Sequence, residues 1–300
     1  MRFLLALLIL SPAAFAETVT APDAKLKLLS KEFSFTEGPI ADSSGDVFFT
    51  DQPNDRIVHY SFADDKLTDW LKPCGRSNGL YFVEPDKLIA CADESNELWE
   101  INIADKSHKV LAKDNFGGPF NGPNDCWVNA DGSIYFTDPL YKRPYWKHEI
   151  PADNPRGVYR VSPEGKIEKV ADGFKQPNGI IGDTENETVY VADIGGKKIF
   201  RFDIDEDGKL VNRKLFCESG SDGMTIDEKR NVYLTNSKGV TVFNPDGELI
   251  ETIPVPRGWT ANVTFAGPKR SQLFITAGNS VFTIPMAVRG LEQKHLAKQN

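Results

Sequence analysis

The sequence of 300 residues predicts an all-β fold, a six-bladed β-propeller. A Glu, Asn or Asp lies in a bend rich in Gly, Pro or Ser six times along the chain, and each bend leads into a β-rich run ending in Thr-Asp, Ala-Asp or a near equivalent. The polar residues are Glu37, Asn78, Asn124, Asn178, Asp222 and Asn262. Their spacings of 41, 46, 54, 44 and 40 residues each suit one four-stranded blade. Six blades place six polar residues around one axis.

Each repeat reads as a polar bend followed by four strands. The fourth repeat shows this most clearly, with expected strands at 179–183, 189–192, 198–202 and 212–216. Dipeptides such as Asp131-Gly132 and Asp207-Gly208 fall at the expected hairpin connections, where glycine or aspartate permits a tight turn. The runs alternate or are continuously apolar, as expected for strands stacked between neighbouring blades.

The last repeat has only three expected strands, at 263–266, 273–276 and 281–284, followed by Pro285 and a polar tail. The segment 26–30 lies directly ahead of the first polar bend, where an outer strand precedes the bends of other repeats. We therefore expect this N-terminal strand to complete the last blade, to close the ring and to remove an open sheet edge. The prediction is a single propeller domain spanning 17–300.

Residues 1–16 have the pattern of a cleaved secretory signal. A single Arg2 precedes an apolar stretch over 3–10, and the segment ends in the small residues of Ala14-Phe15-Ala16. No later run approaches the roughly 20 apolar residues that span a bilayer. We expect a secreted protein, most simply periplasmic, with no membrane association after signal cleavage and with an oligomeric state that the sequence leaves open.

The charge balance argues against a polyanionic partner. The net charge is −8, or −9 once Arg2 leaves with the signal, and the basic residues are scattered. A cation or a neutral small molecule fits better than a nucleic acid. The four cysteines lack metal-type spacing, and they are interpreted either as buried small hydrophobic residues or as partners in a disulfide: Cys74, Cys91, Cys126 and Cys217.

The third repeat carries an enlarged connection after its second strand, over 139–155. Propeller topology returns this connection to the face of the polar bends. An aromatic and basic loop beside an axial site is a lid candidate, with Tyr141 and His148 as candidate substrate contacts. The alternative is a surface insertion that does not touch the site.

Four of the six polar bends supply hard oxygen donors: Glu37, Asn124, Asn178 and Asp222. Two carboxylates and two amides, without His or Cys at equivalent positions, predict one divalent cation, Ca²⁺ before Mg²⁺ or Mn²⁺, with Zn²⁺ as a further possibility. Any single bend of this type is more often only a turn. The hypothesis rests on the set, because symmetry brings equivalent positions together at the axis.

Several motifs resemble one family. They are Glu37-Gly38-Pro39, Asn121-Gly122-Pro123-Asn124-Asp125 with the following 131–139, Gln176-Pro177-Asn178-Gly179 and Ser221-Asp222-Gly223-Met224. Together they resemble the gluconolactonase, senescence marker protein and luciferin-regenerating enzyme family over essentially the whole mature chain. The resemblance implies a six-bladed propeller that hydrolyses lactones, with one axial cation held by Glu37, Asn178 and Asp222. It implies that Asn124 is a further ligand or a substrate contact.

Animal sugar lactonases of this family place an arginine where this chain has Gly122, so that sugar contact does not carry over. Diisopropyl fluorophosphatase and the paraoxonases are related propellers, so the resemblance also leaves the identity of the substrate open.

The expected reaction is attack of water on a lactone carbonyl that the cation polarises. Asp222, and after it Glu37, is the candidate general base. The alternative is that Asp222 is only a ligand and hydroxide is the base. Asn78 and Asn262 are candidate substrate contacts or plain turn residues, and Asp125 is expected to orient its bend. Asp51, Asp93, Asp138 and Asp193 end their strands, where capping of loops is expected, although Asp138 could join a second, structural Ca²⁺ site.

Three classes of function therefore remain after the sequence is read: a metal-dependent lactonase, most simply for a sugar lactone, a metal-dependent phosphotriesterase or arylesterase on the same site, and a non-catalytic sugar-binding propeller. A binding propeller has no need for two carboxylates and two amides at equivalent axial positions. The sequence thus favours an enzyme.

Overall fold

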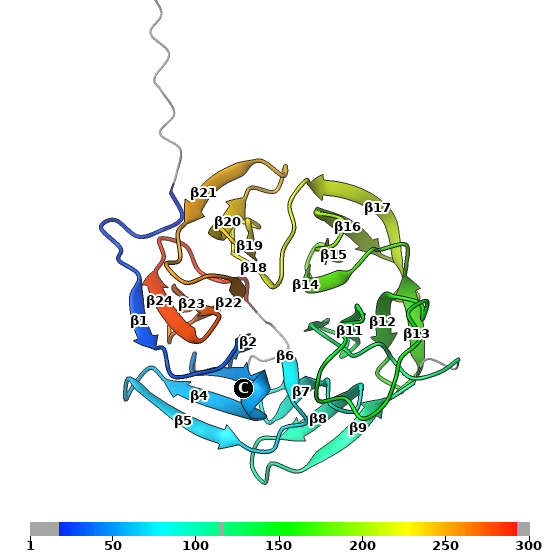
Figure 1. Ribbon diagram of the computed structural model, residues 1–300. Coiled ribbons are helices and arrows are strands. Elements are labelled where there is room, and N and C mark those ends of the chain that lie inside the picture. The colour runs from blue at the N-terminus through cyan, green and yellow to red at the C-terminus, as the bar shows by residue number, and fades with distance from the viewer. Residues whose placement is uncertain (1–17, 115–116, 293–300) are drawn as a thin grey trace, which may run out of the picture.

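The polar bends do mark six blades. The computed structural model describes residues 18–114 and 117–292 and contains six antiparallel four-stranded sheets arranged radially about one axis (Figure 1). The predicted signal segment 1–16 lies outside the described residues. Among the described residues no helix has the length and apolar character of a membrane span.

The first three blades follow the predicted order of strands. Blade one consists of β2 (Thr36–Ala41), β3 (Val47–Asp51), β4 (Arg56–Ser61) and β5 (Lys66–Leu71), with a short 3-10 turn, η1 (Gln52–Asn54). Blade two consists of β6 (Ser77–Glu84), β7 (Lys87–Ala92), β8 (Glu97–Asn102) and β9 (His108–Ala112). Blade three consists of β10 (Cys126–Val128), β11 (Ile134–Asp138), β12 (Gly157–Val161) and β13 (Ile167–Ala171).

The remaining blades complete the ring. Blade four consists of β14 (Pro177–Asp183), β15 (Thr188–Asp193), β16 (Lys198–Ile204) and β17 (Leu210–Cys217). Blade five consists of β18 (Met224–Ile226), β19 (Val232–Asn236), β20 (Gly239–Phe243) and β21 (Leu249–Ile253). Blade six consists of β22 (Thr260–Ala266), β23 (Gln272–Ala277), β24 (Ser280–Pro285) and the N-terminal β1 (Lys27–Ser30).

The N-terminal strand closes the ring as predicted. Lys27 pairs with Thr283 and Leu28 with Phe282 in an antiparallel ladder, so β1 covers the outer edge of β24. The segment before it reaches blade five, where the backbone amide of Val19 donates a hydrogen bond of 2.7 Å to Glu251. The N-terminus therefore ties blades five and six together.

The core lies between the blades. Large aromatic side chains from the first and second strands are fully buried there, including Trp127, Tyr135, Tyr233 and Phe49. The first strand of each blade is the innermost, and it packs against the first strand of the next blade. All four cysteines are buried and unpaired, which agrees with the small-hydrophobe interpretation and not with a disulfide.

Candidate active site at the axis

The structure brings the predicted polar residues to one end of the axis. Glu37, Asn78, Asn178 and Asn262 lie near the starts of the innermost strands β2, β6, β14 and β22, while Asn124 and Asp222 immediately precede β10 and β18. All six are buried, with exposed fractions between 2% for Asn178 and 9% for Asp222. We refer to these six residues as the polar ring.

Irregular pairing re-aims the polar ring toward the axis. The ladder between the first and second strands shifts register between Glu37 and Ile40, between Ser77 and Leu80, and between Pro177 and Ile180. Bulges of this kind rotate a side chain out of the regular alternation. The polar bends of blades one, two and four are therefore a repeated structural device and not simply surface turns.

Glycines that follow the ring residues allow neighbouring blades to approach closely. A Cβ on Gly179 would lie 2.5 Å from the carbonyl oxygen of Asp222, and one on Gly223 would lie 2.0 Å from the side chain of Asn262. No real Cβ tolerates such contacts, so glycine is required by the packing of one ring position against the next. This explains why Asn-Gly and Asp-Gly recur in the sequence.

The threonines at the ends of the second strands hold the bends in place. The Thr235 hydroxyl accepts a hydrogen bond of 2.8 Å from the Gly223 amide and donates one of 2.7 Å to the Ala261 carbonyl in blade six. The Thr276 hydroxyl accepts one of 3.0 Å from the Asn262 amide. The recurring Thr-Asp signature thus fixes the bend that carries each ring residue.

The aspartates that end the second strands of other blades cap loops, as expected. Asp193 accepts hydrogen bonds from the backbone amides of Lys175 and Gln176 at 3.1 and 2.9 Å. Asp138 accepts one of 2.9 Å from the Asn121 amide, while its Oδ1 is buried without a partner among the described residues. Burial raises the pKa of Asp138 to about 7.

Three carboxyl groups share the interior of the polar ring. Burial, and after it the charges of Asp222 and Asp125, raise the pKa of Glu37 well above its usual range. Burial also raises the pKa of Asp222 to about 6 and that of Asp125 to about 7. Among the described residues no ion pair joins any of these three to a basic side chain.

Amide and indole groups orient the carboxylates. The side-chain amide of Asn262 lowers the pKa of both Glu37 and Asp125, and that of Asn178 lowers the pKa of Asp222, so each amide faces the carboxyl groups it stabilises. Trp259 Nε1 donates to Asp222 Oδ2. The sequence analysis missed Trp259, although its place one residue ahead of an innermost strand is a position that faces the ring.

Asp125 orients its bend, because its Oδ1 accepts a hydrogen bond of 3.0 Å from the Cys126 amide.

The donor set fits a hard divalent cation. Two carboxylates and two amides supply oxygen alone, and buried carboxyl groups that repel one another are stabilised in their charged form by a cation between them. The described residues contain no cluster of three or more His, Cys, Asp or Glu side chains arranged for a metal. Any ion here would therefore be held partly by the amide oxygens of Asn124 and Asn178.

The enlarged connection of blade three contacts the site. We call residues 139–156 the lid. Tyr141 accepts, at its hydroxyl, a hydrogen bond of 2.7 Å from Asn178 Nδ2. This contact removes the alternative of an insertion remote from the site. His148 is exposed and stacks on Trp146 with ring centroids 5.1 Å apart.

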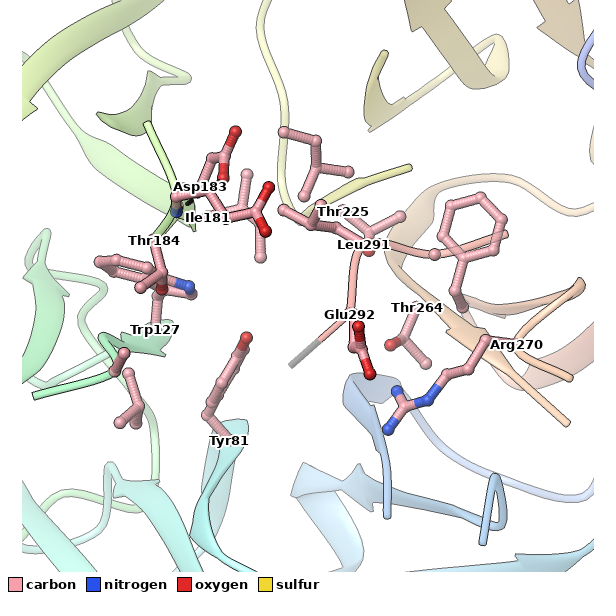
Figure 2. Close-up of a pocket in the computed structure, with 17 residues that line it drawn as sticks. Tyr81, Trp127, Ile181, Asp183, Thr184, Thr225, Thr264, Arg270, Leu291 and Glu292 are labelled. Carbon is pink, nitrogen blue, oxygen red and sulfur yellow. Dashed lines mark hydrogen bonds between the residues drawn. The ribbon is translucent and has the colours of Figure 1, made fainter. Parts of the chain in front are cut away.

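A separate hollow lies at the opposite end of the axis, and Figure 2 shows it. Its lining includes the distal ends of the innermost strands, with Tyr81, Trp127, Asp183 and Arg270 among the side chains around about 590 Å³ of empty space. Asp183 is five residues along β14 from Asn178, roughly 16 Å at about 3.3 Å per residue. The hollow is thus a different region from the polar ring, and we call it the distal hollow.

Comparison with known proteins places the chain in a family. The model of the SMP-30/Gluconolactonase/LRE-like region matches residues 35–279. The protein belongs to this family. The matched region begins just ahead of Glu37 and ends after Asn262, so all six positions of the polar ring lie inside it.

Individual members of this family resemble the chain over most of its length. The gluconolactonase of Zymomonas mobilis is 26% identical over 86% of this chain and 80% of its own. The diisopropyl-fluorophosphatase of Loligo vulgaris is 25% identical over 88% and 93%. The solved structure of a gluconolactonase from Xanthomonas campestris superimposes with a TM-score of 0.83 at 28% identity, covering 91% of this chain and 92% of that one.

Proposed function

We propose that this protein is a cation-dependent hydrolase that opens a lactone ring, most simply that of a sugar lactone. The observation that carries the proposal is the gathering of Glu37 and Asp222, with Asp125 near them, as buried carboxyl groups with raised pKa that no ion pair among the described residues joins to a basic side chain. Such a cluster is costly unless a cation joins it. The gluconolactonases among its relatives support a lactone as the substrate.

Glu37, Asn178 and Asp222 would hold the cation, with Asn124 as a further ligand or as a substrate contact. When bound, the cation supplies Lewis acidity that polarises the lactone carbonyl and stabilises the negative charge that develops on its oxygen. Ca²⁺ suits this all-oxygen set best.

Asp222 accepts the proton of the attacking water. The water oxygen bonds to the carbonyl carbon, the ring C–O bond breaks, and the departing ring oxygen takes up a proton to give a hydroxy acid. In the chain without a cation, burial raises the pKa of Asp222 to about 6, so its carboxylate is ionised at neutral pH and can accept a proton. Trp259 and Asn178 hold the carboxylate in one orientation. Glu37 is the second candidate for this role.

Asn78, Asn262, Tyr141 and His148 remain the proposed substrate contacts. The case for Tyr141 is the most direct, because its hydroxyl touches Asn178. Asn262 spans Glu37 and Asp125, which makes it a positioning group for those carboxylates as well.

A pH-stat screen tests the proposal. Purified protein is assayed against sugar lactones and unsubstituted lactones, after chelation and again with added Ca²⁺. We expect acid release that chelation abolishes and Ca²⁺ restores. No hydrolysis of any lactone at saturating Ca²⁺ would refute the lactonase function.

A phosphotriesterase activity is the second candidate, because the diisopropyl-fluorophosphatase relative covers nearly the whole chain. Fluoride release from diisopropyl fluorophosphate, measured on the same preparation, decides between the two activities. A kcat/KM for the phosphofluoridate above that for every lactone would favour this candidate.

We also propose export to the periplasm, on the basis of the signal pattern in residues 1–16. N-terminal sequencing of the protein recovered from the periplasmic fraction should begin near Glu17. Recovery of the uncleaved chain from the cytoplasm alone would contradict export.

A further inference from the structure

One carboxylate in blade two holds the lid. Asp93 follows β7, its side chain is 3% exposed, and its Oδ2 accepts hydrogen bonds from Arg143 Nε at 2.8 Å and from the Tyr145 hydroxyl at 2.5 Å. Trp146 Nε1 donates to the Asp93 backbone carbonyl at 2.7 Å. The side chains of three lid residues therefore donate hydrogen bonds to a single residue of a neighbouring blade. We call this set of contacts the lid latch.

The lid latch departs from the pattern of the repeat. Asp193, at the equivalent position of blade four, accepts hydrogen bonds from backbone amides of its own blade. The hydrogen bonds described for the Asp93 carboxylate instead come from side chains, those of Arg143, Tyr145 and Gln52. Asp51 of blade one also accepts hydrogen bonds from side chains, but these belong to Asn54 and Arg56 of its own blade. The blade-two aspartate thus differs in binding side chains of the neighbouring blades.

Gly122 is shaped to this arrangement. Its φ of +114° lies in the region that favours glycine, and a Cβ there would be 2.5 Å from Asp93 Oδ1 and 3.1 Å from the Trp146 ring. A larger residue at position 122 would displace the lid latch. The lack of a side chain at position 122, two residues before Asn124, therefore leaves the space that Asp93 and Trp146 occupy in the lid latch.

The lid latch fixes Arg143 beside the polar ring. Its Nε is held by Asp93, and its guanidinium lies 5.0 Å from the centroid of the Tyr141 ring, whose hydroxyl touches Asn178. Among the described residues the two terminal nitrogens of Arg143 donate no hydrogen bond, and the side chain is 22% exposed.

A guanidinium held at Nε, with its two terminal nitrogens open, is arranged to donate hydrogen bonds to a pair of oxygens. An unsubstituted lactone has no oxygens beyond its ester group, whereas a sugar lactone carries hydroxyl groups around the ring. The cation and Asp222 can serve the ester group of either. Arg143 is therefore able to distinguish the two classes.

We propose that Arg143 is a specificity-determining residue that contacts the ring hydroxyls of a sugar lactone, and that Asp93 is the residue that positions it. This inference rests on the proposed lactonase function of the same site. It assigns the recognition of hydroxylated substrates to the lid and leaves the chemistry with the polar ring.

The test compares D-glucono-1,5-lactone with unsubstituted δ-valerolactone at saturating Ca²⁺. For Arg143→Ala we expect kcat/KM for the sugar lactone to fall by about tenfold or more, mainly through KM, because a hydrogen bond from a charged donor is lost. The loss for δ-valerolactone should be several-fold smaller. Arg143→Lys keeps the charge without the planar fork and should recover only part of the loss.

Asp93→Asn should reproduce the same substrate-dependent loss, since the carboxylate that orients Arg143 is removed. Asp193→Asn is the matched control, because it alters the equivalent strand-end residue, whose described hydrogen bonds come from backbone amides outside the lid, and it should lower both kcat/KM values equally or not at all. Trypsin should cleave the lid at Lys142 or Lys147 faster in Asp93→Asn than in Asp193→Asn.

Two results would overturn the inference: equal losses on both lactones for Arg143→Ala, or no loss on either. Failure of the parent protein to hydrolyse either lactone would instead refute the proposed function, so the two failures are distinguishable.

Discussion

The two ends of the axial channel are built from the same six strands and differ in how their charges are balanced. At the distal hollow, Asp183 and Glu185 both pair with Arg230, at 3.0 Å for Asp183. At the polar ring, Glu37, Asp125 and Asp222 have no such partner among the described residues, and burial raises the pKa of each. Arg230 thus balances Asp183 and Glu185 at the distal end, whereas no ion pair among the described residues balances the carboxyl groups of the polar ring.

This difference distinguishes the polar residues that the fold requires from the carboxylates that a function requires. The sixfold repeat of the polar bend explains why polar residues gather at the axis, but neutral polar residues in every blade would form the same bends. Two ring positions carry carboxylates, and Tyr141 of the lid contacts Asn178 of the same ring. An uncompensated buried charge that the fold does not need is a reason to assign the chemistry to that end.

The largest effect should come from removing the closure on which both ends depend. Deletion of residues 17–31 removes β1 from the edge of β24 and the contact of Val19 with Glu251. We expect an insoluble protein, or one whose Tm falls by roughly 10 °C or more. A soluble variant that melts like the parent in calorimetry would show that β1 is dispensable for the ring.

Asp222→Asn should sharpen the contrast between the ends. The change keeps an oxygen ligand and removes the proton acceptor, so kcat should fall by about 10²-fold or more at saturating Ca²⁺ while metal affinity falls modestly. Asn178→Asp keeps the acceptor chemistry and should retain the metal. Steady-state kinetics and calcium titration measure both effects.

Asp183→Asn is the control for this prediction at the distal end, where the charge is already paired, and it should change kcat by less than about twofold. If Asp222→Asn hydrolyses lactones at nearly the parental rate, Asp222 is a ligand only, and Glu37 or hydroxide is the base.

Removal of the metal should destabilise the protein through the polar ring alone. Without a cation, Glu37 and Asp222 repel one another, so chelation should lower the Tm and Ca²⁺ should restore it. At 100 times its Kd, Ca²⁺ stabilises by about 2.7 kcal/mol, which corresponds to a Tm shift of roughly 5–10 °C. An unchanged Tm after verified removal of metal would contradict an axial site.

The stability of the chelated protein should also depend on pH in a defined direction. Burial raises the pKa of Asp222 from 3.8 to about 6 and that of Asp125 from 3.8 to about 7. Between pH 3.8 and these raised values, the folded chain therefore binds more protons than the unfolded chain. Their contribution to stability is therefore present in acid and lost as the pH rises from about 4 through 7. Melting curves at pH 5 to 8 should show the difference between the chelated and calcium-loaded protein growing with pH. A constant difference would show that the ring carboxyls do not titrate in this range.

The sequence predicted the ring better than it predicted the surroundings of the ring. One polar residue per repeat is visible because symmetry repeats it six times, and the ring closure follows from a missing strand. The lid latch and Trp259 were not predicted, because each occurs once and depends on contacts between different blades. The polar tail after Pro285 also lacks periodicity, and the structure shows that its described part returns to blade five, where the Leu291 amide donates to the Ile226 carbonyl at 3.0 Å. Unique tertiary contacts leave no repeated signal in a sequence.

The smallest effect should come from opening the distal hollow. Gly290 and Leu291 close it through hydrogen bonds to the carbonyls of Arg270 and Ile226, at 2.9 and 3.0 Å, and Leu291 packs partly buried against the core. Truncation after Arg289 removes these contacts and should lower the Tm by only a few degrees, since about two hydrogen bonds and part of one apolar side chain are lost. Because Arg230 still compensates Asp183, and the polar ring lies roughly 16 Å away at the start of the same strands, kcat/KM for lactones should stay within about twofold. A soluble truncated protein with a large loss of activity would mean that the distal end takes part in the reaction and that the two ends are not independent.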